Sequence, residues 1–184
     1  MAATTTELAD RWYTTQFSVR RSIRYHQRRR AFYDRLDKLS NMLSLIFGSA
    51  AIYGVLEENA KSVALVSSAI VTIVSSINLV VGSAQRGRDH TDFMRKYVEL
   101  EKSMLGVECE DRLLQVQTER LNIEAEEPPV MHVLNAMCHN EMMRAMGFKK
   151  KELPKIGFFQ ALLAQLFDFR ESSIQNPKTK SKTT

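Results

Sequence analysis

The chain has 184 residues, with 26 Lys and Arg against 21 Asp and Glu and a pI of about 9.3. This length corresponds to about one domain and excludes a large multidomain enzyme. Hydrophobic residues make up 44% of the chain, with only seven Gly and four Pro, which excludes a disordered or collagen-like protein. The mean hydropathy of −0.26 is typical of a soluble protein, but it averages over two long apolar blocks.

A continuous helix is predicted from near residue 5 into the first apolar block. The run from Thr4 to Glu7 provides an N-cap residue with Glu three positions later, and neither Pro nor Gly follows before Gly48. Residues 1–38 are therefore expected to form a basic N-terminal helix. The alternation typical of strands is missing throughout the sequence, so the chain is predicted to be all-α.

Two uncharged blocks are long enough to cross a membrane. Residues 39–56 provide eighteen positions without a charge, and residues 62–84 provide twenty-three. As helices they would extend about 27 and 34 Å, against a hydrocarbon core of about 30 Å. The alternative is a buried hairpin in a soluble bundle, but the rest of the chain offers little apolar surface to cover it. The sequence therefore predicts a transmembrane hairpin.

The charges that flank the two blocks predict the orientation of this hairpin. Residues 11–38 hold nine Lys or Arg and residues 86–102 hold five, whereas the linking loop, residues 57–61, holds one. Because positive charge favours the cytoplasmic side, both termini are expected in the cytoplasm and only the loop outside. The long basic segment before the first block does not fit a cleavable signal peptide. Cys109 and Cys138 would stay reduced, and their spacing fits no metal motif.

Cytoplasmic helical segments are predicted after the hairpin. The first is an arm that continues the second apolar block and packs against the N-terminal helix. Glu126 to Pro129 ends this arm, because proline disfavours helix in the preceding residue. The acidic run that precedes the prolines is expected to pair with the arginine-rich helix or with Lys149 to Lys151, or to be a solvated helix end. The expected segments are an arm (85–125), a helix (126–148), a linker with an amphipathic C-terminal helix (149–171) and a disordered tail (172–184).

The second apolar block carries a stripe of hydroxyl side chains, and on the first block Ser44 and Gly48 form a small-xxx-small pair that favours close packing. Hydroxyl residues of this kind favour helix packing, whereas in an oligomer the same stripe would line a water-filled pore. Two helices per chain cannot enclose a pore, so pore lining requires several copies. Both interpretations are open. The stripe falls within an arc of about 100° and consists of Ser68, Thr72, Ser75, Ser76 and Ser83.

An arginine cluster precedes the first apolar block. Arg20, Arg24 and Arg28 recur every fourth residue and so lie on one helical face, with Arg21 beside them. Guanidinium groups bind anions such as phosphate, and neighbouring aromatic rings offer stacking surface for a nucleotide or short oligonucleotide. Arginines beside a membrane helix also fix its orientation and contact anionic headgroups, which alone would explain most of the cluster.

The sequence contains no recognisable catalytic or metal-binding constellation. The four histidines form no HExxH motif, and the sequence has no CxxC pair, glycine-rich phosphate loop or GxSxG turn. The run from Cys138 to Glu141 has suggestive residue types, but neighbours in a helix point to different faces. We therefore predict a protein that is not an enzyme and has neither catalytic residues, a cofactor nor a metal ion.

Together these features resemble the SLATT domain family over about residues 10 to 150. The likeness consists of the arginine-rich helix, the hairpin with its short loop, the pattern H-x-x-F-x-x-x-Y-x-x-L-E from His90 to Glu101, and the segment E-P-P…C-H-N-E…G from Glu127 to Gly147. Membership implies a prokaryotic antiviral effector encoded beside a nucleotidyltransferase that makes a cyclic or linear nucleotide signal. It implies an oligomer whose channel breaches the inner membrane, so that the infected cell stops before phage matures.

The sequence and the resemblance lead to one hypothesis. The chain is expected to form a homo-oligomeric channel, tetrameric or larger, in the bacterial inner membrane, acting in abortive infection. An oligonucleotide bound by Arg20, Arg21, Arg24 and Arg28 would gate it from the cytoplasmic side, and the hydroxyl stripe would line the pore. The alternative is a non-conducting membrane anchor or scaffold that recruits a partner through its cytoplasmic helices.

Overall fold

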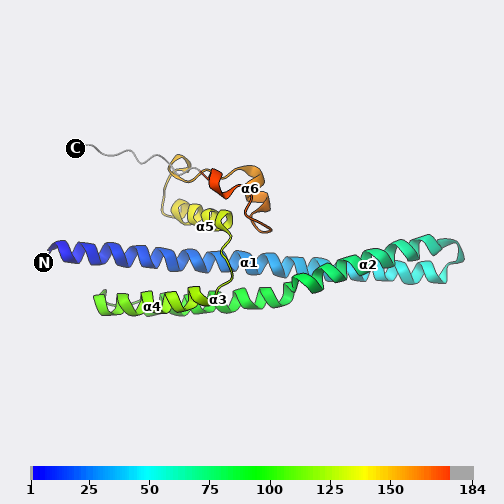
Figure 1. The fold of residues 1–184 in the computed structure, drawn as a ribbon, viewed down its shortest axis with the longest axis horizontal. Coiled ribbons are helices and arrows are strands. Elements are labelled where there is room, and N and C mark those ends of the chain that lie inside the picture. Colours follow the sequence, from blue (N-terminus) through cyan, green and yellow to red (C-terminus); the bar gives the residue numbers. More distant parts are fainter. Residues whose placement is uncertain (1, 175–184) are drawn as a thin grey trace. The chain divides into compact units, whose positions relative to one another are not determined.

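The computed structural model describes residues 2–174 and shows an all-helical protein, which confirms the predicted class (Figure 1). The chain divides into two compact units. The first unit contains residues up to Gln27 and from Asp92 onward, and the second contains Arg28–Thr91. The helices are α1 (Ala2–Leu56), α2 (Lys61–Val81), α3 (Ser83–Ser103), α4 (Glu110–Glu126), α5 (His132–Ala145) and α6 (Phe158–Leu163), with 3-10 helices at Glu58–Ala60, Lys150–Glu152 and Glu171–Ser173.

The second unit contains both apolar blocks. α1 continues through the first block to Leu56, and α2 covers most of the second, so two helices are long and apolar enough to cross a membrane. The two helices touch where the Ser44 and Ser75 hydroxyls lie 3.4 Å apart. Large apolar side chains of both blocks are exposed in the single chain, with Leu45 at 73% and Leu79 at 83% of their surface. These helices therefore have an apolar exterior.

The second apolar block is broken at Gly82, although the sequence predicted one helix to residue 84. Gly82 has a φ of 62°, in the left-handed region, and its N–H donates to the Asn78 carbonyl to cap α2. Glycine adopts this conformation without the steric cost that a Cβ brings. α3 begins at the next residue, so the hydroxyl of Ser83 belongs to α3 and is buried.

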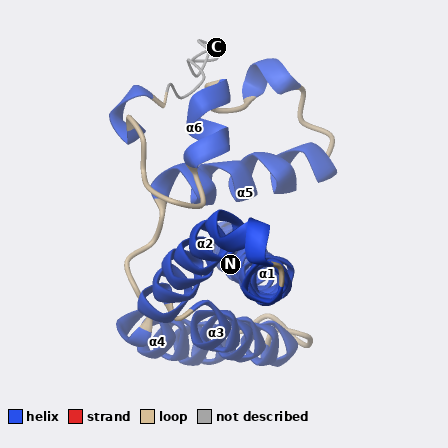
Figure 2. Cartoon of the chain, turned by 90° about the vertical axis from the view of Figure 1, so that its right-hand side faces the viewer, coloured by secondary structure: helices blue, strands red, loops and turns tan. Residues whose placement is uncertain are grey.

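The first unit has a three-helix core built from the start of α1, the end of α3, and α4. Figures 1 and 2 show α4 beside α3, so the predicted arm of residues 85–125 is two helices joined by a reversal. The reversal falls between Ser103 and Glu110, and it returns the apolar stripe of α4 to the same core. The buried core side chains are Trp12, Val19, Ile23, Tyr97, Leu100, Met104, Leu113, Val116 and Ile123.

A second, smaller core forms where α5 and the α6 segment pack around Tyr25 of α1 (Figure 2). Val133, Leu134, Cys138 and Ala164 are its other buried members. The predicted helix of segment 149–171 is confined to six residues, because the chain after α6 leaves the helix. Asp168 there accepts the backbone N–H groups of His132 and Val133 at 2.7 and 3.0 Å, which caps the N-terminus of α5.

The tail, predicted to be disordered over residues 172–184, lies outside the described residues apart from its first three positions. Ser172 and Ser173 belong to the last 3-10 helix.

Gly54 permits the closest approach between α1 and the start of α2. A Cβ placed at Gly54 would lie 2.5 Å from the Ala64 backbone nitrogen and 2.7 Å from the Ala60 carbonyl oxygen. At Gly48, which the sequence pattern favoured as the packing position, a Cβ would meet no atom within 4 Å. The close contact of the hairpin therefore lies near the loop, at Gly54.

We expect Gly54→Ala to lower the free energy of unfolding by about 1–3 kcal/mol, because the clash is with backbone that cannot rotate away. Gly48→Ala is the matched control and should leave this free energy unchanged or raise it by up to about 1 kcal/mol, since alanine favours helix. Thermal unfolding of both variants in detergent, followed by circular dichroism, measures the difference. Equal unfolding temperatures would contradict the close approach at Gly54.

Candidate functional site

The arginine-rich part of α1 contacts carboxylates of the first unit. Arg20 Nε donates to Glu101 Oε1 of α3 at 2.6 Å, and Arg24 Nη1 donates to Glu141 Oε1 of α5 at 3.1 Å. The two arginine side chains keep 50% and 40% of their surface exposed. Ion pairs at this exposure add little to stability.

Arg21 lies on a pocket of about 340 Å³ between α1, α3, α4 and the turn after α4. This volume is at the lower end of the roughly 300–1,000 Å³ that ligand pockets occupy. Two buried polar atoms among its lining residues, Arg21 Nε and the Tyr97 hydroxyl, have no hydrogen-bond partner among the described residues. Buried polar groups are normally paired, so these two leave capacity for water or for a polar ligand.

Glu127 is held at the edge of this pocket by His26. Glu127 Oε1 lies 3.2 Å from His26 Nε2, and both side chains are buried. The imidazole stacks on Phe93 and Tyr97, with ring centroids 5.4 and 5.7 Å apart, which fixes its position. Of the acidic run before the prolines, Glu127 thus meets the arginine-rich helix, while Glu124 pairs with Arg120 and Glu126 with Lys96.

The charges around Arg21 are of both signs, because Arg120 acts on it and the carboxylates Glu124 and Glu127 line the same pocket. Burial, together with the positive charge of Arg120, lowers the pKa of Arg21. Burial and the charge of Arg21 likewise lower the pKa of His139. Burial raises the pKa of Tyr97, with Glu127 as the next contribution, so this hydroxyl stays protonated. Glu124 acts in the opposite direction to Arg120 and favours the charged form of Arg21.

Three of the four predicted ligand-binding arginines, Arg20, Arg21 and Arg24, fall in the first unit, whereas Arg28 belongs to the second and is half-buried. Of the predicted pore-lining residues, Ser68, Thr72, Ser75 and Ser76 are exposed and Ser83 is buried.

Two hydroxyls of the stripe are satisfied by their own helix. Ser68 Oγ donates to the Leu65 carbonyl at 3.0 Å, and Thr72 Oγ1 donates to the Ser68 carbonyl at 2.8 Å. Such bonds let a hydroxyl face lipid, protein or water, so the placement of the stripe alone favours no single environment.

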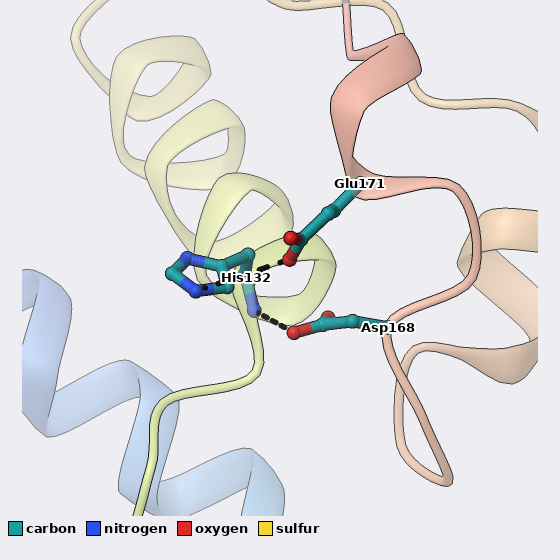
Figure 3. A group of neighbouring side chains, drawn as sticks. All are labelled: His132, Asp168 and Glu171. Carbon is teal, nitrogen blue, oxygen red and sulfur yellow. Dashed lines mark hydrogen bonds and ion pairs between the residues drawn. The ribbon is translucent and has the colours of Figure 1, made fainter.

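His132, Asp168 and Glu171 form a further cluster on the first unit (Figure 3). One ligand atom from each lies within 4.8 Å of the others, a spacing that a divalent metal ion can bridge. Asp168, however, already caps α5 with both oxygens, and Glu171 Oε2 lies 3.9 Å from His132 Nε2. His132 and Glu171 are largely exposed, so helix capping accounts for the cluster without a metal.

Sequence reasoning missed the pocket, because its lining residues lie far apart in the chain. The separation between Tyr25 and Met131, joined by a 3.0 Å hydrogen bond, is 106 residues. Two segments of the sequence could have indicated the pocket. The pattern ending in Tyr97, Leu100 and Glu101 supplies a pocket residue and the partner of Arg20, and the segment that begins at Glu127 supplies further pocket residues.

No protein family, curated sequence or solved structure matched this chain.

We predict different effects on stability for substitutions at two tyrosines of the pocket. The Tyr25 hydroxyl accepts the Met131 N–H at 3.0 Å, whereas the buried Tyr97 hydroxyl has no such bond. We expect Tyr25→Phe to lower the free energy of unfolding by about 1 kcal/mol, and Tyr97→Phe to leave it unchanged or slightly raised. Thermal unfolding in detergent measures both changes. A loss at Tyr97 equal to that at Tyr25 would mean that the Tyr97 hydroxyl is structurally bonded, and the pocket would lose its unsatisfied donor.

Proposed function

We propose that this chain is an oligomeric membrane channel gated by a cyclic or linear oligonucleotide that binds the arginine-rich part of α1. On the resemblance to SLATT domains, the ligand is the product of a nucleotidyltransferase encoded nearby. The channel acts in the bacterial inner membrane as an effector of anti-phage defence by abortive infection, with both termini in the cytoplasm.

The observation that carries the membrane assignment is the exposure of the apolar blocks. A soluble bundle would bury Leu45 and Leu79, but in this fold they face outward, as do Leu56 and Val80. Monomeric soluble proteins rarely expose a contiguous apolar surface of this kind. Lipid covers such helices at no cost in free energy, and the basic flanks supply the charge asymmetry of a membrane hairpin.

The ligand assignment is supported by the arrangement of Arg20, Arg21 and Arg24. A phosphate competes with Glu101 and Glu141 for the guanidinium groups, because it offers more charge and more acceptor oxygens than a carboxylate. Displacing Glu101 and Glu141 would loosen the links from α1 to α3 and α5. The ligand would thereby favour an arrangement of these helices in which the arginines are released from the carboxylates.

α1 provides the route from ligand to membrane. The same helix carries the arginines and the first apolar block, with no break between them. When the contacts of α3 and α5 with α1 change, the change therefore acts on a helix that also forms part of the hairpin.

A non-conducting scaffold is the second candidate, and the hydroxyl stripe is the observation that favours it. Ser68 and Thr72 bond to their own backbone, and Ser75 meets Ser44 of α1. These contacts fit helix packing in lipid as well as they fit a pore.

Single-channel current from purified protein in a planar bilayer separates the two candidates. Discrete conductance that changes when the nucleotidyltransferase product is added supports the gated channel. A silent bilayer with confirmed insertion supports the scaffold.

Ligand competition predicts opposite effects for the two members of one ion pair. Arg24→Gln should weaken oligonucleotide binding about tenfold, because it removes a charged hydrogen-bond donor. Glu141→Gln should strengthen binding, because it frees Arg24. Arg11→Gln is the matched control, because Arg11 also lies on α1 but outside the cluster, and it pairs with Glu110 of α4. Titration calorimetry on the full chain in detergent measures the affinities, and weaker binding by Glu141→Gln would contradict competition.

The pore interpretation predicts an effect of Ser76→Leu, because Ser76 is exposed on the stripe. This change should reduce single-channel conductance several-fold without changing oligomer size. Ser49→Leu, at an exposed hydroxyl of α1 outside the stripe, is the control and should leave conductance unchanged. Equal conductance of Ser76→Leu and wild type would remove the stripe from the pore.

A further inference from the structure

The C-terminal part of the first unit exposes a surface of phenylalanine and leucine side chains, here called the phenylalanine patch. The patch covers α6 and the chain that follows it, within residues 158–169. Phe158 is 76% exposed and Phe159 66%, and the others are 37–63% exposed. Its members are Phe158, Phe159, Leu162, Leu166, Phe167 and Phe169.

The patch inverts the usual placement of polar and apolar side chains. Gln160, between these apolar residues, is the buried member of α6. Its Oε1 accepts the Gly157 N–H at 2.8 Å, and its Nε2 donates to the Arg170 carbonyl at 2.8 Å. These bonds tie both ends of the segment together and hold the phenylalanines outward. The exposure is therefore built into the fold by a satisfied buried amide.

Basic residues adjoin the patch in the sequence. From Arg144 to Glu171 the sequence has six Lys or Arg and three acidic residues. Two of the acidic side chains accept backbone N–H groups: Glu152 from Lys149 at 2.9 Å, and Asp168 from the first turn of α5. The third, Glu171, lies 3.9 Å from His132 Nε2. Lys149, Lys150, Lys151 and Lys155 are exposed.

We infer that the phenylalanine patch docks on an anionic lipid surface. Phenylalanine and leucine side chains enter the boundary between headgroups and acyl chains, and surrounding lysines bind the anionic headgroups. A second copy fits less well, because a symmetric contact would place the lysine-rich run against its own copy. An acidic partner protein would pair with the lysines. Its charged surface would, however, offer the exposed phenylalanines no apolar surface to pack against.

This docking is independent of channel activity. It concerns residues 149–169, outside the pocket and outside both apolar blocks, so a silent channel leaves it intact. Conversely, failure to dock leaves the ligand site and the pore proposal standing.

The test measures the membrane depth of the patch in the full chain. Cys109→Ser removes the exposed native thiol, while Cys138 is buried and unreactive. An environment-sensitive fluorophore is then attached at Phe159→Cys, or at Thr118→Cys as the control on an exposed face of α4. The protein is reconstituted into vesicles of phosphatidylcholine alone, or of phosphatidylcholine and phosphatidylglycerol in equal parts. Both lipids carry a nitroxide quencher on the upper acyl chain.

In anionic vesicles we expect nitroxide quenching at position 159 and little quenching at position 118. Each lysine near an anionic leaflet shifts docking by about fivefold, so changing the four lysines to Gln should lower the docked fraction at least tenfold. Quenching at position 159 no greater than at position 118 would overturn the inference. Efficient crosslinking between two copies of Phe159→Cys, together with equal quenching of the label in both kinds of vesicle, would assign the patch to a second copy. That result would also overturn the inference.

Discussion

The unbroken helix α1 is the constraint on which the rest of the structure depends. It runs for 55 residues, and the other helices pack along it. In the first unit α3 and α4 share its Trp12 and Val19 core, and α5 and α6 pack around Tyr25. In the second unit α2 meets it at Ser44. α1 thus contributes packing residues to each unit.

In the proposed function, the arginine-rich part of α1 has both a structural and a binding role, and the two compete. Arg20 and Arg24 link α1 to neighbouring helices through exposed ion pairs, which are individually weak. Arg21 is half-buried near Arg120 and has an unpartnered Nε, which makes it the least satisfied of the three. Arg21 alone of the three lines the pocket, so an anion bound there that also reached Arg20 and Arg24 would displace only weak pairs. Such an imbalance is what a ligand needs to shift a population between two helix arrangements.

The sequence was sufficient to predict what depends on local pattern. The length of the apolar blocks predicted the two long apolar helices, and the missing strand alternation predicted an all-α chain. The reversal after Ser103 was not predicted, although Gly106 lies in this segment, because a single glycine does not determine whether the chain turns back. The short α6 was not predicted either. Its length depends on Gln160 and Asp168, whose partners are set by tertiary contacts. The pocket, with residues from α1, α3 and α4, is a tertiary feature for the same reason.

Charge connects the two proposed binding surfaces. If the hairpin crosses the membrane twice as proposed, its two flanks lie on one side, and their basic residues favour the cytoplasmic side with its anionic leaflet. The arginines of α1 and the lysines beside the phenylalanine patch then face the same pool of anions. In the proposed function, Arg20 and Arg24 are released from their carboxylates more readily by a multiply charged phosphate than by a monovalent headgroup. The lysines have flexible stems and no such restraint, so they suit the diffuse charge of a lipid surface. The two proposals therefore assign the oligonucleotide and the membrane to different residues of one unit.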